Sequence, residues 1–226
     1  MYPIDQLALK IWIEKAGFRH SCFISWPSRS GPKVKKLVAK LKQAIEEEAP
    51  TYGLPASVFS DADIPTGTSW EAKMSRALCE SIAMIAICGP EYYNSDWCGR
   101  EWAGMLLLAQ RRLGPDECAI LPLVEQILRS SSTSGLMQLE ILPPPVKKFQ
   151  CIADLSRIRL RRRNYEESDE FDDIIRRATA RICEIALQLA KRGSRAADCG
   201  SFVLPVESSF SGFRQAAQRF PFLTEP

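Results

Sequence analysis

The stretch Ala83–Cys88, AMIAIC, decides the fold of this chain. All six residues are apolar, and no polar residue alternates with them. Such a run is typical of a central parallel strand that is buried on both faces of a sheet. Gly89 and Pro90 end the strand, and a helix is predicted from Ser95 to Arg112. A buried strand that leads so directly into a helix indicates an α/β protein.

Further strands and helices alternate on both sides of this stretch. Short β-prone runs predict strands at His20–Ser25, Ala56–Phe59, Cys118–Val124 and Phe149–Asp154. Apolar residues recur with the helical period over Lys33–Glu48, Trp70–Ser81 and Asp169–Arg192. Strands that alternate with helices in this way predict a doubly wound parallel sheet of five strands.

Two segments fall outside the alternation, so we predict one domain with two helical appendages. The domain covers residues 20–192, and residues 1–19 form the N-terminal appendage. Residues 193–226 form a linker and then a tail helix, whose apolar stripe contains Phe210, Phe213, Ala217 and Phe220. The stripe has to cover either the domain's own core or a sensor or regulatory partner. We expect the stripe to pack on the domain's own core. Docking there would keep the protein inactive, because the helix would cover a self-association face.

Composition and charge exclude several classes of protein. The chain is 46% hydrophobic and 25% charged, as globular proteins are. The numbers of positive and negative residues are nearly balanced, and a net charge of +3 is too small to indicate a nucleic-acid binder. Five arginines in the range 157–163 fit either an acidic-ligand patch or a solvated edge strand, and we favour the strand. The apolar runs are far shorter than the roughly 20 residues of a membrane helix, and no secretory signal is present, so we expect a cytoplasmic protein.

The eight cysteines include no CxxC pair and mostly lie in apolar runs. This pattern predicts reduced, buried thiols. Cys98 is expected to behave as a small buried apolar residue, because no histidine is available to activate it as a nucleophile. No metal site is expected, since His20 is the only histidine.

Four motifs follow one another in a specific order along the chain. They are FISW at 23–26, VFSDADIPTGTSW at 58–70, IAICGPEYYNSDWCGREW at 85–102 and AILPLV at 119–124. In this order they resemble a TIR (Toll/interleukin-1 receptor/resistance) domain of bacterial type, whose fold is flavodoxin-like. FISW resembles the first strand of that family, with Trp26 where tyrosine is usual. The D-x-D-I-P-x-G stretch resembles the family's BB loop.

The resemblance implies one of two functions. One branch of the TIR family cleaves NAD⁺ with a glutamate that follows the signature tryptophan by four residues, and here Glu101 follows Trp97. The chain is then expected to be an NAD⁺ glycohydrolase, active when self-assembled, in bacterial immunity or antiviral defence. NAD⁺ is its substrate, and no cofactor is expected. The alternative is a non-catalytic TIR interaction module that signals through TIR–TIR contacts.

The chemistry of the bond favours a single carboxylate as the catalytic group. Cleavage builds positive charge on the ribose, as in glycoside hydrolysis. Nicotinamide leaves as a neutral molecule, so it does not have to be protonated. One carboxylate that faces the developing cation can therefore suffice, and Glu101 is the expected catalytic residue. The structural alternative is that Glu101 is an ordinary acid favoured by the helix dipole.

The remaining site residues are expected at the carboxyl edge of the sheet, where open α/β folds bind ligands. The expected substrate contacts are Trp26, Arg29, Asp61, Trp70 and Trp97. Arg29 is expected to bind the pyrophosphate, and Trp26 or Trp70 to stack on a base. Trp70 fits packing into the core equally well. The residues expected to mediate self-association are Ile64, Pro65 and Gly67.

Overall fold

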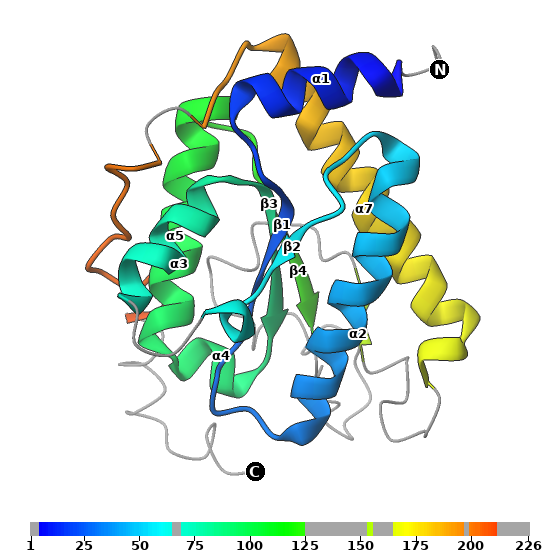
Figure 1. Cartoon of the computed structure of the whole chain (residues 1–226). Coiled ribbons are helices and arrows are strands. Elements are labelled where there is room, and N and C mark those ends of the chain that lie inside the picture. Colours follow the sequence, from blue (N-terminus) through cyan, green and yellow to red (C-terminus); the bar gives the residue numbers. More distant parts are fainter. Residues whose placement is uncertain (1–4, 65–68, 125–152, 156–164, 197–198, 212–226) are drawn as a thin grey trace.

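The chain forms a parallel β-sheet with a layer of helices on each face (Figure 1). The computed structural model describes residues 5–64, 69–124, 153–155, 165–196 and 199–211. The strands follow one another across the sheet in the order β2 (Val58–Phe59), β1 (His20–Ser25), β3 (Ser81–Cys88) and β4 (Ile120–Val124). A two-residue strand, β5 (Ala153–Asp154), pairs in parallel with β4.

The helices make two layers, which confirms the α/β fold with a parallel sheet. One layer contains α1 (Gln6–Ala16), α2 (Pro32–Glu48) and α7 (Asp169–Lys191). The other contains α3 (Trp70–Cys79), α4 (Pro90–Asn94) and α5 (Asp96–Leu113). Short 3-10 turns lie at η1 (Ala49–Tyr52), η2 (Asp61–Asp63) and η4 (Tyr165–Glu167). The count of five strands stays a prediction, because residues 149–152 of the expected fifth strand lie outside the described residues.

Strand β3 is the centre of the sheet, as its composition predicts. All of its residues are buried, and it pairs with β1 on one side and β4 on the other. Ile85 lies opposite Ile24 of β1 and Leu121 of β4. The apolar side chains of β3 therefore contact both helical layers.

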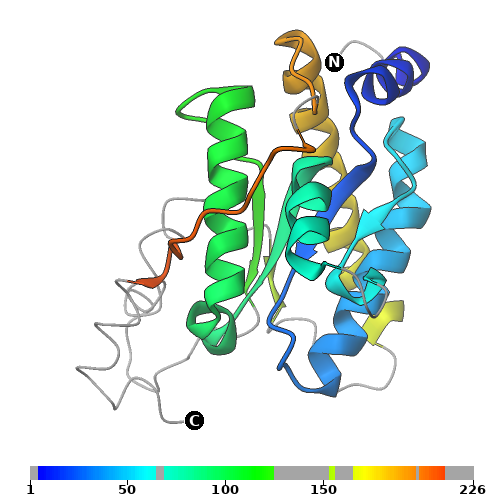
Figure 2. The ribbon, with the colours of Figure 1, turned by 60° about the vertical axis from the view of Figure 1, so that its left-hand side comes forward.

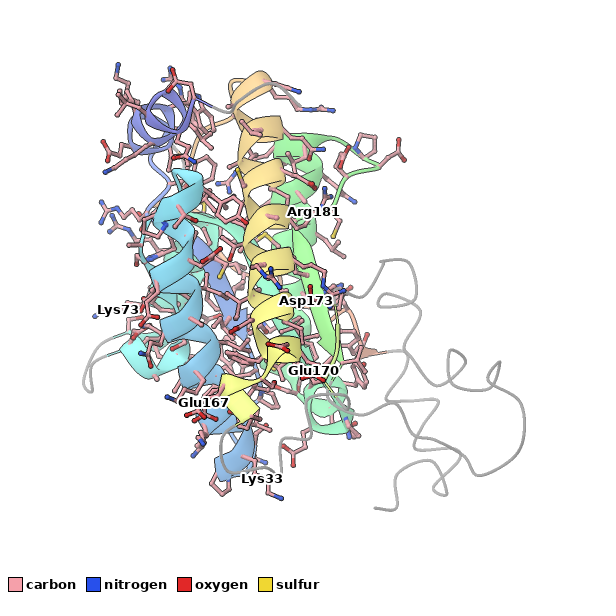
Figure 3. The ribbon with its side chains drawn as sticks, turned by 90° about the vertical axis from the view of Figure 1, so that its right-hand side faces the viewer. Lys33, Lys73, Glu167, Glu170, Asp173 and Arg181 are labelled. Atoms are coloured by element: carbon pink, nitrogen blue, oxygen red, sulfur yellow. A yellow bond between two sulfur atoms is a disulfide. The ribbon has the colours of Figure 1, made fainter. Side chains whose placement is uncertain are left out.

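Helix α7 has a buried apolar side and a charged outer side. Its apolar positions pack against the sheet and α2, while Glu170, Asp173 and Arg181 lie along the outer side (Figure 3). The Ser168 side chain accepts a hydrogen bond from the backbone of Phe171 and caps the start of the helix. The expected glycine at its end is present as Gly193, at a φ of 63°.

Two other expected helices differ from the structure in their limits. The helix near the N-terminus is present as α1, which buries Leu9 and Ile13. The helix expected from Ser95 to Arg112 is preceded by a separate short helix, α4. The two are separate because Ser95 is extended, and its side chain accepts a hydrogen bond from the backbone of Cys98 to cap α5. No helix in the described part of the chain is long and apolar enough to cross a membrane.

The C-terminal segment Cys199–Ser211, here called the strap, runs over the outer side of α5 (Figure 2). A disulfide joins Cys199 to Cys79 at the end of α3. The expectation that every cysteine is reduced is therefore wrong for this pair, because the fold brings together two residues that are 120 positions apart. The expected tail helix lies almost wholly outside the described residues, which end at residue 211.

Candidate active site

Glu101 lies in the second turn of α5 and is buried, with 4% of its surface exposed. Its Oε2 accepts a hydrogen bond of 2.5 Å from Oγ of Ser25, the last residue of β1. The Ser25 oxygen lies 2.8 Å from the hydroxyl of Tyr92 on α4. Because Ser25 donates its own proton to Glu101, Tyr92 donates to Ser25. The carboxyl of Glu101 is thus fixed by a chain of two hydroxyl groups.

These three residues meet at the point where the strand order of the sheet reverses. From β1 the chain continues to β2 on one side, whereas β3 and β4 lie on the other side. Ser25 ends β1, and Tyr92 follows β3 directly. In open α/β sheets this reversal leaves a crevice at the carboxyl ends of the strands, where ligands bind. Glu101 therefore occupies the position that sheet topology favours for a ligand site.

Burial changes the protonation of Glu101. The loss of hydration raises the pKa of this carboxyl to about 8, and the charge of Asp61 raises it further, while the hydrogen bond from Ser25 opposes both. The group is therefore mainly protonated at neutral pH in the free protein. A cation placed beside it would favour the ionised form, because opposite charges stabilise each other in a site with little water.

Asp61 and Trp26 lie at the same edge of the sheet. Asp61 begins η2, just after β2, and burial raises the pKa of its carboxyl, whereas the Trp26 indole lowers it. Even so, Trp26 Nε1 and Asp61 Oδ1 are buried atoms that complete no regular hydrogen bond within the described residues. The two groups therefore face each other as a buried polar pair that no regular hydrogen bond completes, which is uncommon for buried atoms.

Trp70 and Trp97 pack against each other at the starts of α3 and α5. Their ring centroids are 4.3 Å apart and the ring planes stand at 89°. The Arg100 guanidinium lies 4.3 Å from the Trp97 ring centroid and pairs with Glu71 at 2.5 Å. For Trp70 this arrangement favours packing over stacking on a base, since its ring already contacts Trp97 and the core.

The other residues expected to form the site lie partly within the described residues and partly outside them. Arg29 is exposed in the turn between β1 and α2. Ile64 is half-buried and packs against the hydrophobic core, and its role in self-association stays a prediction. Pro65 and Gly67 lie outside the described residues, as do the arginines of 157–163. Cys98 is buried as expected, and burial raises the pKa of its thiol well above the usual value.

The sequence reasoning missed Ser25 and Tyr92 as parts of the site. Both lie within motifs that it used, FISW and the α4–α5 signature, but neither was given a role. A polar residue at the end of an apolar strand was the available signal for Ser25. No group of three or more metal-ligating side chains occurs in the described part of the chain.

A family model of the TIR domain matches residues 22–175. The match extends over more than half of the chain. The chain belongs to the TIR domain family. The region matched contains Ser25, Tyr92 and Glu101 of this TIR domain and leaves out α1 and the strap.

Comparison with solved structures finds a more distant similarity. The TIR domains in a structure of the activated Roq1 resistosome directly recognizing the pathogen effector XopQ are 17% identical to this TIR domain, with a TM-score of 0.39. The alignment covers 80% of this chain and 94% of that one. No curated protein matches this TIR domain.

Proposed function

We propose that this TIR domain is an NAD⁺ glycohydrolase, which breaks the bond between nicotinamide and ribose. The proposal rests on the buried carboxyl of Glu101, held in one orientation by Ser25 where the strand order reverses. A rigid, poorly hydrated carboxyl acts more strongly on a nearby cation than an exposed one, because water does not screen it.

In the proposed reaction the bond from ribose C1′ to the nicotinamide nitrogen breaks. The electron pair of the bond stays with nicotinamide, which leaves neutral, and C1′ becomes cationic. Glu101 loses its proton to solvent when the cationic nicotinamide ring binds beside it, and the resulting carboxylate stabilises this charge. Water then adds to C1′ and loses a proton, which gives ADP-ribose.

The remaining contacts are assigned by the chemistry of the substrate. Asp61 and Trp26, whose indole faces the Asp61 carboxyl, are the groups assigned to the ribose hydroxyls. Arg29, exposed in the turn between β1 and α2, suits the pyrophosphate. With 4% of Glu101 exposed, substrate requires a more open arrangement than the one described. We therefore expect the protein to be active in the self-assembled state. Self-assembly would use contacts at Ile64, Pro65 and Gly67. The proposed role is that of a cytoplasmic effector of bacterial defence.

The proposal is tested by the release of nicotinamide from NAD⁺ at increasing protein concentration. We expect the rate to rise more steeply than the concentration, and Ile64→Asp to remove that extra rise. Glu184→Gln, an exposed change on α7, is the control and is expected to cleave at the wild-type rate. A strictly proportional rate would contradict the link to self-assembly.

One observation favours the alternative, a non-catalytic TIR interaction module. Glu101 is nearly inaccessible, and its raised pKa keeps it protonated at neutral pH. If the protein associates in light scattering and yet releases no nicotinamide at any concentration, the interaction module is the correct function.

A further inference from the structure

The strap is joined to α3 and α5 at several points along its length. Besides the disulfide, the Leu204 amide donates to Ser75 Oγ at 3.3 Å. The Pro205 carbonyl accepts from Arg100 Nε at 2.8 Å, and the Ser209 amide donates to the Gly99 carbonyl at 3.1 Å. The strap is thus bonded to the helix that carries Glu101 (Figure 2).

Two glycines of α5 make room for the strap. A Cβ at Gly99 would lie 1.7 Å from Ser208 Oγ, and one at Gly104 would lie 2.8 Å from Leu204 Cδ2. A glycine inside a helix costs about 1 kcal/mol relative to alanine. The docked strap is the neighbour that explains both, since it fills the space that larger side chains would occupy.

Phe210 ends the contact in an aromatic cluster beside the site. It is fully buried, and its ring centroid lies 5.8 Å from that of Tyr92, 5.6 Å from that of Tyr93 and 5.5 Å from that of Trp102. Trp102 is the neighbour of Glu101 in the chain. Tyr92 is the residue whose hydroxyl bonds to Ser25, which in turn holds Glu101.

We propose that the strap positions the catalytic carboxyl: Phe210, docked between Tyr92 and Trp102, holds Tyr92 and therefore Ser25 and Glu101 in place. Phe210 is a positioning residue, since it acts through Tyr92. The proposal rests on the glycohydrolase function. It assigns the described part of the tail a role that supports catalysis, whereas the sequence led us to expect an inhibitory role.

The titration of Glu101 is a direct readout of this packing. The groups that face it or its hydroxyl chain are Asp61 on η2, Cys98 on α5, Tyr92 on α4 and Cys88 on β3. Burial is the largest cause of its raised pKa. Removal of the Phe210 ring leaves a space beside Tyr92 that water can enter, so the pKa of Glu101 should fall toward its usual value.

Three variants of the full chain separate positioning from stability. Phe210→Ala removes the ring, and Phe210→Leu restores much of its volume. Leu204→Ala is the matched control, because Leu204 is an equally buried strap residue that packs at Gly104, away from the Tyr92 cluster. The carboxyl of Glu101 is titrated by carbon NMR on glutamate-labelled protein, with Glu101→Gln used to assign its signal. Melting temperature, kcat and KM for NAD⁺ are measured alongside.

We expect Phe210→Ala to lower the pKa of Glu101 by about one unit or more. It should lower kcat by about 10- to 100-fold with little change in KM, because small displacements of a catalytic group have effects of this size. Phe210→Leu should recover most of both. Leu204→Ala should lower the melting temperature by a similar amount and leave the pKa of Glu101 and kcat unchanged.

The NMR titration does not depend on activity, so the two proposals can fail separately. An unchanged titration in Phe210→Ala, or an equal shift in Leu204→Ala, overturns the positioning role. A shifted titration with an unchanged kcat in an active enzyme also overturns it. If the titration shifts only in Phe210→Ala and even the wild type releases no nicotinamide, the glycohydrolase function is wrong while the link from Phe210 to Glu101 holds.

Discussion

The two helical layers of this TIR domain meet their surroundings in different ways. The outer side of α7 in the α2–α7 layer carries charged residues, with ion pairs between Asp173 and Arg177 and between Arg181 and Glu184 (Figure 3). The outer side of α5 in the α3–α5 layer carries Gly99 and Gly104 and lies under the strap (Figure 2). Within the described residues, the outer side of α7 faces solvent, while the outer side of α5 is covered by the strap.

The difference shows how a covered helix is recognised in a sequence. A solvent-facing helix keeps long charged side chains, because water solvates them at little cost. A helix that another segment covers needs small residues where the backbones approach. Here the covered helix also carries Glu101, so the strap contacts the same helix as the residue proposed to be catalytic.

The largest expected effect is on catalysis in the covered layer. Glu101→Gln keeps the shape of the side chain and removes the charge that stabilises the ribose cation in the proposed reaction. We expect NAD⁺ cleavage to fall about 10²-fold or more, as when one stabilising group is removed from other sites. Nicotinamide release is the measurement, and circular dichroism verifies the fold. Cleavage near the wild-type rate by folded Glu101→Gln would show that Glu101 is not catalytic.

The second effect is a pH dependence of stability. The pKa of Glu101 is about 8 in the folded protein, above its ordinary value of 4.5. Between these two pKa values the folded state keeps a proton that the unfolded chain has lost. The free energy of unfolding that this group contributes therefore declines as the pH rises from 4.5 to about 8. Between pH 6 and 9 the wild type should lose about 2 kcal/mol relative to Glu101→Gln. Denaturant unfolding of both proteins measures the difference. A constant difference across this range would contradict the raised pKa.

The third effect tests the space under the strap. In Gly99→Ala the added Cβ meets Ser208, and the strap has to move. The expected cost is about 1 kcal/mol, after the gain in helix propensity is subtracted from the cost of overpacking. Gly200→Ala is the control, because among the described residues no atom beyond its chain neighbours lies within 4 Å of its Cβ position. Equal stability of the two variants would mean that the strap does not press on α5.

The smallest effect is expected on the solvent-facing layer. Arg181→Ala breaks the ion pair with Glu184, whose atoms are 2.8 Å apart at the surface. Exposed pairs within one helix contribute about 0.5 kcal/mol or less. Thermal unfolding at low and high salt measures it. A larger loss would show that the outer side of α7 is covered in solution and does not face solvent.

Local patterns were enough to predict β3, α7 and the position of Glu101. Each depends on residues that are close in sequence: the apolar run of β3, the helical period of α7 and the spacing from Trp97 to Glu101. The hydroxyl chain was not predictable in the same way. Ser25 and Glu101 are 76 positions apart, and only the strand order brings them together.

The covalent and apolar contacts of the strap were still harder to foresee. No local rule pairs Cys79 with Cys199, and an even count of cysteines in apolar runs fits free thiols as well. The glycines of α5 were visible in the sequence, but a glycine alone does not say which segment will lie over it. Phe210 was expected to be covered, and the surface that covers it became known only from the fold.

The bond between Cys79 and Cys199 also sets an effective concentration. It fixes the first residue of the strap on α3, so Phe210, eleven positions later, searches only a small volume around its own cluster. Tethers of this length correspond to millimolar local concentrations or more. The strap of a second molecule therefore competes poorly for the same contacts on α3 and α5 while the bond is intact. Reduction of the bond lowers the effective concentration of Phe210 at its own cluster. Exchange of straps between neighbouring molecules then becomes easier.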